Sequence, residues 1–247
     1  MKLTQFLIPI FCCLFLSCHT PYEVTSLDTA NEKVSAANAD TLSAIALYLR
    51  PLRDSLSQVM DEKLSEAKGM FTKAKPSGSL GNFITDVMFW KAQQKQAQTL
   101  GVMYNYGGIR LNQIPDGPIT KGKIYELLPF DNELVLVSIK GAVLKVWLQS
   151  VIKSGGWPIS RSLAFTTDSL GNIAFNSGQS ISDSVDYYVA TNDYVANGGD
   201  DCTFLKGVSQ IHTGMLTRDV MIEYLRMTPQ VMPDTLQRIL WKNEIKK

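Results

Sequence analysis

The sequence predicts an α+β fold, in which helices and strands are mixed without strict alternation. Two observations support this prediction. Some segments carry apolar residues at helical spacing, whereas others are short apolar runs rich in β-branched residues and bounded by turn signals. The chain has 247 residues and is 45% hydrophobic, which is enough for one sizeable core.

The helices are predicted from apolar spacing. Residues 42–59 carry apolar side chains on one side, and Pro51 inside this pattern is expected to kink or divide the helix. Residues 80–98 combine an apolar face with Lys and Gln residues that face solvent. Further helices are expected at 121–128, at 141–152, at 217–227 and after Pro233.

The strands are predicted from short apolar runs. Residues 100–104 indicate a buried strand that ends at the turn signal Gly107-Gly108. Residues 163–165 and 173–175 flank a turn and therefore predict a hairpin. Two further strands are expected at 133–140 and 186–191.

The first residues are similar to a bacterial lipoprotein signal. Met1 and Lys2 supply a positive start, and the apolar run at 8–16 is too short to span a membrane. A small residue and a cysteine, Ser17-Cys18, follow this run. Cys18 is therefore predicted to be lipidated and to become the mature N-terminus, and several acyl chains would hold it stably on a membrane. The alternative is an ordinary cleaved signal peptide with a chance cysteine.

The predicted organisation has three parts. Residues 1–17 form the signal peptide, and residues 18–40, rich in Ser, Thr, Ala and Asn, form a lipidated tether. Residues 41–247 form one domain without a repeat or an internal linker. The protein is accordingly expected in the bacterial cell envelope, anchored by lipid and facing the periplasm or the exterior.

Charge and cysteine content argue against a nucleic-acid-binding protein and against a protein stabilised by disulfides. The formal net charge is +1, so no strong field favours a nucleic-acid partner. Processing at Cys18 leaves Cys202 as the other cysteine of the mature chain. A structural disulfide is therefore not expected, and Cys202 is interpreted as a small packing residue.

Five segments, in the same order, resemble the C-terminal domain of 5′-nucleotidases. Three of them read SLGNFITD, NYGGIR and LPFDN, the fourth is a strand-glycine-helix run, and the fifth reads TNDYVANGGD. They occupy residues 79–86, 105–110, 128–132, 134–148 and 191–200. The resemblance covers about residues 40 to 225 and implies a layered α/β sandwich that holds the nucleoside part of a nucleotide.

The resemblance assigns two aromatic residues to the base. Phe130 and Tyr194 stand where the family stacks a nucleobase between two rings, a contact worth about 1 to 3 kcal/mol per ring. The family often has Phe at the position of Tyr194. The alternative is that both rings belong to the core, although each lies beside Pro or Gly in an expected loop.

The resemblance also implies polar contacts. Asp200 would accept hydrogen bonds from the ribose hydroxyls, the alternative being a turn aspartate that caps its own loop. Asn105 would bond the base or ribose, and Asn132 would contact the base edge. Arg110 would grip ribose or phosphate oxygens with its fork of donors, the alternative being a surface ion pair.

Three departures from the family pattern affect the expected site. Lys75 lies where the family usually carries an arginine, so the phosphate grip is expected to be weaker. Tyr106 replaces a glycine and could narrow the pocket mouth. Asp201 and Cys202 replace a glycine-aromatic pair, which leaves base preference open.

The catalytic half of the family is not recognisable in this sequence. Its metallophosphoesterase domain needs two metal ions held by Asp, His and Asn ligands, whereas this chain has two histidines, His19 and His212, and no metal-ligand spacing. A Gly-x-Ser-x-Gly elbow and a P-loop are also absent. The family is one of hydrolases, but we expect this chain to hold no cofactor and to be inactive alone, with divalent metals in a partner chain.

Three hypotheses follow for the function. The first is the nucleotide- or nucleoside-recognition domain of a split 5′-nucleotidase in nucleotide catabolism, acting with a separate metallophosphoesterase chain. The alternative is a stand-alone surface lipoprotein that binds nucleosides or nucleotides without catalysis. The third is a structural lipoprotein that has lost ligand binding, against which the retained set Arg110, Phe130, Tyr194 and Asp200 argues.

Overall fold

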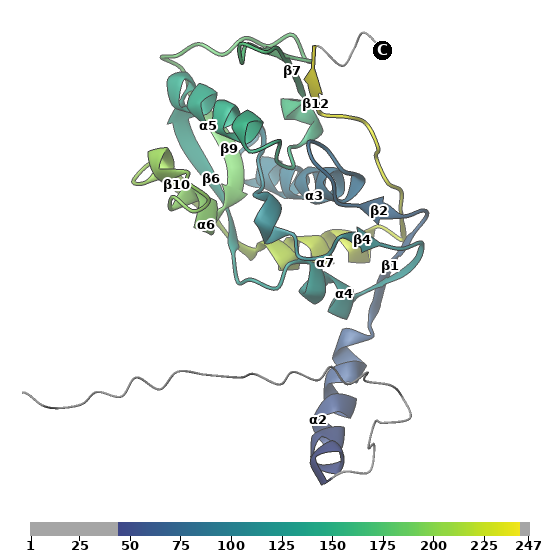
Figure 1. Cartoon of the computed structure of the whole chain (residues 1–247). Coiled ribbons are helices and arrows are strands. Elements are labelled where there is room, and N and C mark those ends of the chain that lie inside the picture. Colours follow the sequence, from purple (N-terminus) through teal and green to yellow (C-terminus); the bar gives the residue numbers. More distant parts are fainter. Residues whose placement is uncertain (1–43, 243–247) are drawn as a thin grey trace, which may run out of the picture. The chain divides into compact units, whose positions relative to one another are not determined.

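The computed structural model describes residues 44–242 (Figure 1). The predicted signal peptide, Cys18 and the tether lie outside the described residues, so the predicted lipid anchor and the domain boundary at residue 41 stay predictions. Two units are distinguished, one ending at Leu49 and one running from Arg50, and they divide within helix α2 (Ala44–Met60). Between residues 44 and 242, no helix is long and apolar enough to cross a membrane.

A four-stranded sheet with the order β10-β6-β9-β3 forms the centre of the second unit. Strand β6 runs antiparallel to both neighbours, and β9 runs parallel to β3. In the middle of the sheet Leu136 lies opposite Ala190 on one side and Ile211 on the other. The strands are β3 (Thr99–Val102), β6 (Glu133–Lys140), β9 (Asp186–Asn192) and β10 (Ser209–Leu216).

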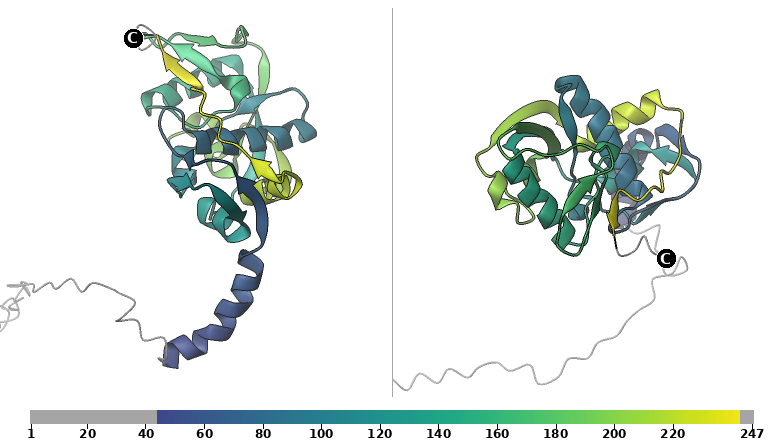
Figure 2. Two further views of the ribbon diagram at one scale, coloured as in Figure 1. Left: turned by 90° about the vertical axis from the view of Figure 1, so that its right-hand side faces the viewer. Right: turned by 90° about the horizontal axis from the view of Figure 1, so that it is seen from above.

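Helices cover both faces of this sheet (Figures 1 and 2). Successive side chains of a strand point to opposite faces. Accordingly, Leu134 and Leu136 join the core beneath α3 and α7, while Val135, Val137 and Ile139 join the core beneath α5. Burial on both faces explains why β6 is a continuous apolar run rather than an alternating one. The helices are α3 (Ser79–Lys95), α5 (Gly141–Lys153) and α7 (Thr217–Met227).

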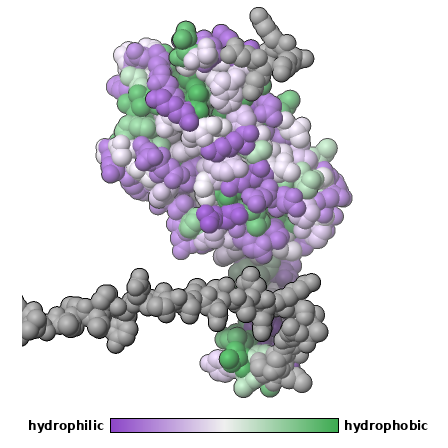
Figure 3. Space-filling view, viewed as in Figure 1, coloured by the Kyte–Doolittle hydropathy of each residue, from purple (hydrophilic) through white to green (hydrophobic). Residues whose placement is uncertain are grey.

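Three small sheets surround this core. One contains β1 (Lys63–Ala67), β5 (Gly117–Thr120) and β11 (Gln230–Val231); another contains β7 (Phe165–Thr167), β8 (Ile173–Phe175) and β12 (Ile239–Trp241); the third pairs β2 (Phe71–Thr72) with β4 (Gln113–Ile114). Short helices complete the domain: α4 (Lys121–Leu127), α6 (Asp193–Ala196) and the 3₁₀ turns η2 (Tyr106–Gly108), η3 (Arg161–Leu163) and η4 (Thr203–Leu205). The face shown in Figure 3 is largely hydrophilic with smaller apolar areas.

The predicted mixture of helices and strands is confirmed, and the hairpin forms as β7 and β8. Helix α2 continues through Pro51 without being divided. The helix predicted after Pro233 is wrong, because this segment runs extended along the domain and ends in β12 (Figures 1 and 2).

A buried arginine explains this difference. Arg238 is 1% exposed and pairs with Asp86 and Asp234. Its backbone N–H also donates to Ser77 Oγ at 3.0 Å. A buried charge needs such partners, and satisfying them fixes the segment in an extended path that local apolar spacing does not reveal.

Candidate functional site

Three loops meet at one edge of the central sheet. Because β3 and β9 are parallel, the loops that follow them leave at the same edge. Strand β6 is antiparallel to β9, so the loop that precedes β6 arrives at this edge as well. These connections carry Asn105 after β3, Phe130 and Asn132 before β6, and Tyr194 in the short helix α6 that follows β9. Sheet topology thus brings together residues that are far apart in the sequence.

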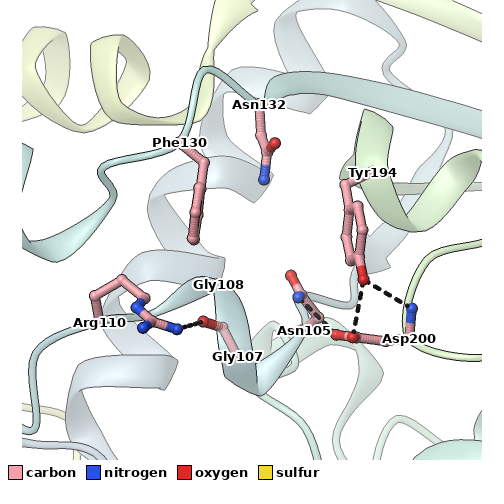
Figure 4. A pocket seen from close by; sticks show the side chains of 8 residues that line it. All are labelled: Asn105, Gly107, Gly108, Arg110, Phe130, Asn132, Tyr194 and Asp200. Carbon is pink, nitrogen blue, oxygen red and sulfur yellow. Dashed lines mark hydrogen bonds between the residues drawn. The ribbon is translucent and has the colours of Figure 1, made fainter. Parts of the chain in front are cut away.

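The three loops enclose a pocket of about 400 Å³ (Figure 4). The six residues predicted to bind substrate all line it, together with two glycines. The lining residues are Asn105, Gly107, Gly108, Arg110, Phe130, Asn132, Tyr194 and Asp200.

Two aromatic rings stand on opposite sides of the pocket with an open gap between them (Figure 4). Phe130 is 46% exposed and Tyr194 is 48% exposed. The interpretation of these rings as core aromatics is therefore wrong. Two exposed rings across a gap can accept a flat π system between them, and Asn132 lies above the gap in Figure 4.

The Phe130 loop is held by an arginine from another part of the sequence. Arg218 on α7 is 9% exposed, and its guanidinium donates to the carbonyls of Pro129 at 3.3 Å and Phe130 at 3.5 Å. It also pairs with Asp131 and lies 4.6 Å from the centroid of the Tyr125 ring. These contacts fix the backbone from which Phe130 projects.

A chain of polar side chains forms the floor beneath Tyr194. Asn192 is fully buried, and its Nδ2 donates to Asn105 Oδ1 at 2.8 Å. Asn105 Nδ2 in turn donates to Asp200 Oδ2 at 2.7 Å. Asp200 Oδ1 accepts a 3.3 Å hydrogen bond from the Tyr194 hydroxyl. The side chain of Asp200 therefore faces pocket residues, and the interpretation as an aspartate that caps its own loop is not supported by these contacts.

The backbone at this floor adopts an unusual conformation. Asp200 and Asp201 have φ angles of +48° and +63°, and they are the non-glycine residues with positive φ within residues 44–242. Aspartate tolerates this left-handed region better than most residues, but it still costs free energy. Gly199 has no positive φ; instead, a Cβ there would lie 2.4 Å from the Tyr194 ring. Glycine is needed because the aromatic ring packs directly against the backbone.

Three cationic side chains lie near one another beside the pocket. Arg110 donates to Gly107 O at 3.4 Å, and its Cζ lies 5.7 Å from the Phe130 centroid. Lys73 and Lys75 approach the Tyr106 ring at 3.9 and 5.0 Å. Partial burial, together with the charges of Arg110 and Lys75, lowers the pKa of Lys73. No salt bridge joins these cations to a carboxylate within residues 44–242, so the interpretation of Arg110 as a surface ion pair is wrong.

Tyr106 does not narrow the pocket. It is not one of the lining residues, and it packs partly buried against the core beneath α5. Its ring instead lies beneath the two lysine ammonium groups.

The remaining candidate groups do not line the pocket. Within residues 44–242, no cluster of three His, Cys, Asp or Glu side chains could hold a metal ion. His212 Nδ1 lies 2.8 Å from Glu133 Oε2 in an exposed pair. Cys202 is fully buried, and burial together with the charges of Asp200 and Asp201 raises the pKa of its thiol to about 12. A thiol held protonated in the core packs rather than reacts.

Comparison with known protein families identifies the family of this chain. The family model described as "5′-nucleotidase, C-terminal domain" matches residues 63–207, which is more than half of the chain. The chain belongs to the 5′-nucleotidase C-terminal domain family. The predicted family and fold are thereby confirmed, and the segments that carry Asn105, Phe130 and Tyr194 fall within the matched region.

Individual proteins that are similar to this chain agree with this family assignment. A 5′-nucleotidase precursor from Thermus thermophilus superposes with a TM-score of 0.68 and 28% identity, over 80% of this chain and 44% of that structure. The trifunctional nucleotide phosphoesterase YfkN of Bacillus subtilis is 32% identical over 139 residues, which are 49% of this chain and 9% of YfkN. A probable 5′-nucleotidase of Treponema pallidum is 39% identical over 80 residues, 32% of this chain and 13% of that protein. The chain thus spans less than half the length of these relatives.

Two residues of this 5′-nucleotidase-like site were missed by sequence reasoning. Asn192 lies within the quoted segment TNDYVANGGD, and its place at the end of strand β9 could have indicated an inward-facing amide. Arg218 gives no comparable signal, because its partners lie 87 to 89 residues earlier in the chain.

Proposed function

We propose that this chain recognises the nucleoside part of a nucleotide in a split 5′-nucleotidase, whose catalytic metals belong to a separate metallophosphoesterase chain. The observation that carries the proposal is the pocket in Figure 4, which combines two facing rings, a carboxylate and an arginine. Each of these groups suits one part of a nucleotide.

The base is proposed to stack between Phe130 and Tyr194. A nucleobase has two apolar faces and a polar edge, so it fits a gap with aromatic sides. The amide of Asn132 offers both a donor and an acceptor to that edge. Because an amide can hydrogen-bond to the edges of several bases, the proposal names no particular base.

The sugar is proposed to lie against Asp200. An ionised carboxylate only accepts hydrogen bonds, so it can receive both hydroxyls of a vicinal diol. Asn105 holds one carboxylate oxygen at 2.7 Å, and Asn192 fixes Asn105. The carboxylate is consequently oriented before the ligand arrives, which reduces the ordering cost of binding.

The phosphate is proposed to lie near Arg110. This arginine lines the pocket, and the positive charges of Lys73 and Lys75 lie near it. Cations without carboxylate partners attract a phosphate dianion, and the planar fork of Arg110 can bind two of its oxygens. These charges favour a nucleotide over a nucleoside.

A partner chain is proposed because hydrolysis needs metals. Two divalent ions would activate a water molecule and neutralise charge on the phosphate. Residues 44–242 offer no cluster of ligands for them, and the relatives named above are much longer than this chain. Lipid attachment at Cys18 in the bacterial cell envelope, with the domain facing the periplasm or the exterior, is proposed from the sequence alone.

Calorimetric titration of the purified full chain with adenosine and adenosine monophosphate tests recognition. We expect both to bind, with the monophosphate tighter. An Arg110→Met variant should remove most of this difference while leaving adenosine affinity unchanged, and Lys153→Met, which lies on α5, serves as the control. If neither compound nor any other nucleoside binds, the proposed recognition is wrong.

Nucleotide hydrolysis tests the split enzyme. The chain is mixed with a metallophosphoesterase chain encoded beside it, and phosphate release is compared with that of each chain alone. We expect the mixture to be faster than the metal-bearing chain alone, and Asp200→Asn to abolish the gain. Tight nucleoside binding without any gain in hydrolysis would instead favour the alternative, a stand-alone binding lipoprotein.

A further inference from the structure

The carboxylate of Asp200 is already engaged on both oxygens. Oδ2 accepts from Asn105 Nδ2 at 2.7 Å, a short contact. Oδ1 accepts from the Tyr194 hydroxyl at 3.3 Å, a long contact for two oxygen atoms. The same hydroxyl also accepts from the Asp200 backbone N–H at 3.4 Å. Figure 4 shows the phenol reaching down the side of the pocket to this residue. One oxygen is held firmly and the other loosely.

The local structure brings the phenol to this place. Asn192 caps α6 by accepting from Val195 N–H at 2.9 Å, which sets the direction in which Tyr194 leaves the helix. The ring then packs on Gly199, where any Cβ would lie 2.4 Å from it. The left-handed backbone of Asp200 turns its carboxylate back towards the hydroxyl. The contact between Tyr194 and Asp200 therefore follows from three separate constraints.

We propose that the Tyr194 hydroxyl is a displaceable substitute for a sugar hydroxyl, and that it thereby limits how strongly the site prefers a ribose over a sugar without hydroxyls. This inference rests on the proposed function, because it concerns the same sugar position. When a vicinal diol enters, one of its hydroxyls donates to Oδ1 and the phenol gives up that contact. The bond to Asn105 stays, since Oδ2 has a second lone pair for the other sugar hydroxyl.

The exchange replaces one hydrogen bond with another, so the ribose gains less than it would from a free oxygen. A phenylalanine at the same position would stack on the base equally well and would leave Oδ1 open to the sugar. A sugar without hydroxyls does not compete for Oδ1, and the hydroxyl of Tyr194 should not affect its binding. The effect of the hydroxyl is therefore visible as a difference between two ligands with the same base.

The test compares adenosine with 2′,3′-dideoxyadenosine by calorimetry on the full chain, as wild type and as Tyr194→Phe. We expect adenosine to bind about fivefold tighter to the variant, the value of one net hydrogen bond. We expect dideoxyadenosine to bind both proteins equally. Tyr187→Phe is the matched control. It removes the hydroxyl of a tyrosine on β9 that lies outside the pocket and accepts from Ser182 N–H.

Three results would overturn the inference. Adenosine affinity that is unchanged or weaker in Tyr194→Phe would show that the hydroxyl is neutral or orients the carboxylate. An equal gain for both ligands would show that the hydroxyl acts on the base. In these cases wild-type adenosine binding still supports the proposed function. If no nucleoside binds to wild type, Tyr194→Phe or Tyr187→Phe, the proposed function is itself wrong and the inference falls with it.

Discussion

The two aromatic sides of the pocket are built in different ways. The Tyr194 wall, residues 192–200, is a continuous segment in which the helix cap, the ring and the carboxylate contact one another. The Phe130 wall, residues 129–132, has no such internal support. Its carbonyls are held by Arg218, and Asn132 O accepts from Thr217 N–H at 2.8 Å, both from α7.

Because of this difference, the two walls are sensitive to substitutions at different places in the chain. Changes that affect the Tyr194 wall should lie within its own segment or in Asn105, which bonds Asn192 and Asp200. Changes that affect the Phe130 wall can lie far away in sequence, on α7. Three substitutions test this comparison, and a fourth tests an exposed pair outside both walls.

The largest effect is expected at the carboxylate of the Tyr194 wall. Asp200→Asn keeps the size of the side chain and its tolerance of a left-handed backbone, but it removes the charge and one acceptor. We expect adenosine affinity to fall by about 2 to 3 kcal/mol, since hydrogen bonds to charged groups are the stronger ones. Asp201→Asn, the neighbouring left-handed residue, is the control and should bind normally. Equal losses in both variants, measured by calorimetry, would contradict a specific sugar contact.

The next effect concerns the ring of the Phe130 wall. Phe130→Ala should weaken adenosine binding by about 2 kcal/mol through loss of stacking. Because Phe130 is 46% exposed, the melting temperature should change little. Phe130→Tyr keeps the ring and should retain most of the affinity. A loss of stability as large as the loss of binding would mean that Phe130 belongs to the core after all.

A smaller effect is expected from the support of the Phe130 wall. Arg218→Met leaves the carbonyls of Pro129 and Phe130 without this donor and removes the pair with Asp131, which should destabilise the fold by about 1 to 2 kcal/mol. Adenosine affinity should also fall, but not further when Phe130→Ala is already present, because both changes act through the same ring.

The control for Arg218 lies on the same helix. Arg226→Met removes an exposed arginine that pairs with Glu62, and exposed pairs contribute at most about 1 kcal/mol. It should leave binding unchanged. Additive losses of Arg218→Met and Phe130→Ala in the double-mutant cycle would show that Arg218 does not act through Phe130.

The smallest effect concerns the exposed pair at the start of β6. Partial burial opposes ionisation of Glu133, but hydrogen bonds from His212 and from the Gly214 N–H hold the pKa of its carboxyl below the ordinary value. A carboxyl with a lowered folded-state pKa stabilises the protein above its unfolded pKa, and the stabilisation is lost as pH falls through the folded pKa.

Glu133→Gln should therefore lower the melting temperature at pH 7, by an amount equivalent to less than about 1 kcal/mol. The difference from wild type should shrink as the pH is lowered below about 4. A difference that is constant from pH 7 to pH 3 would show that the ionised form of Glu133 is not what stabilises the fold.

Sequence patterns located the longer helices and the strands that carry apolar runs, but missed most of the short strands. Helix α3 carries an apolar face and strand β6 carries a continuous apolar run, because α3 packs one face against the sheet and β6 is buried on both faces. Strand β10 was missed because its residues are exposed or half-buried and show no apolar run. Strand β12 was predicted as a helix because the partners of Arg238 at Asp86 and Asp234 cannot be read from local spacing.

The site residues also divide into those that the sequence indicates and those whose positions are set by the fold. The resemblance selected Asn105, Arg110, Phe130, Asn132, Tyr194 and Asp200, and the structure brings all six into one pocket. Tyr106 does not line the pocket as expected, because its packing is set by contacts across the fold.

The family, the mixture of helices and strands, and the residue types that can stack on a base or accept from a sugar could all be predicted from the sequence. These properties depend on side-chain chemistry and on spacing within single segments. The structure was needed to show that Arg218 supports Phe130, that Asn192 orients Asn105, and that the Tyr194 hydroxyl contacts Asp200. Such contacts form only in the folded sheet, because its parallel and antiparallel strands place distant loops at the same edge.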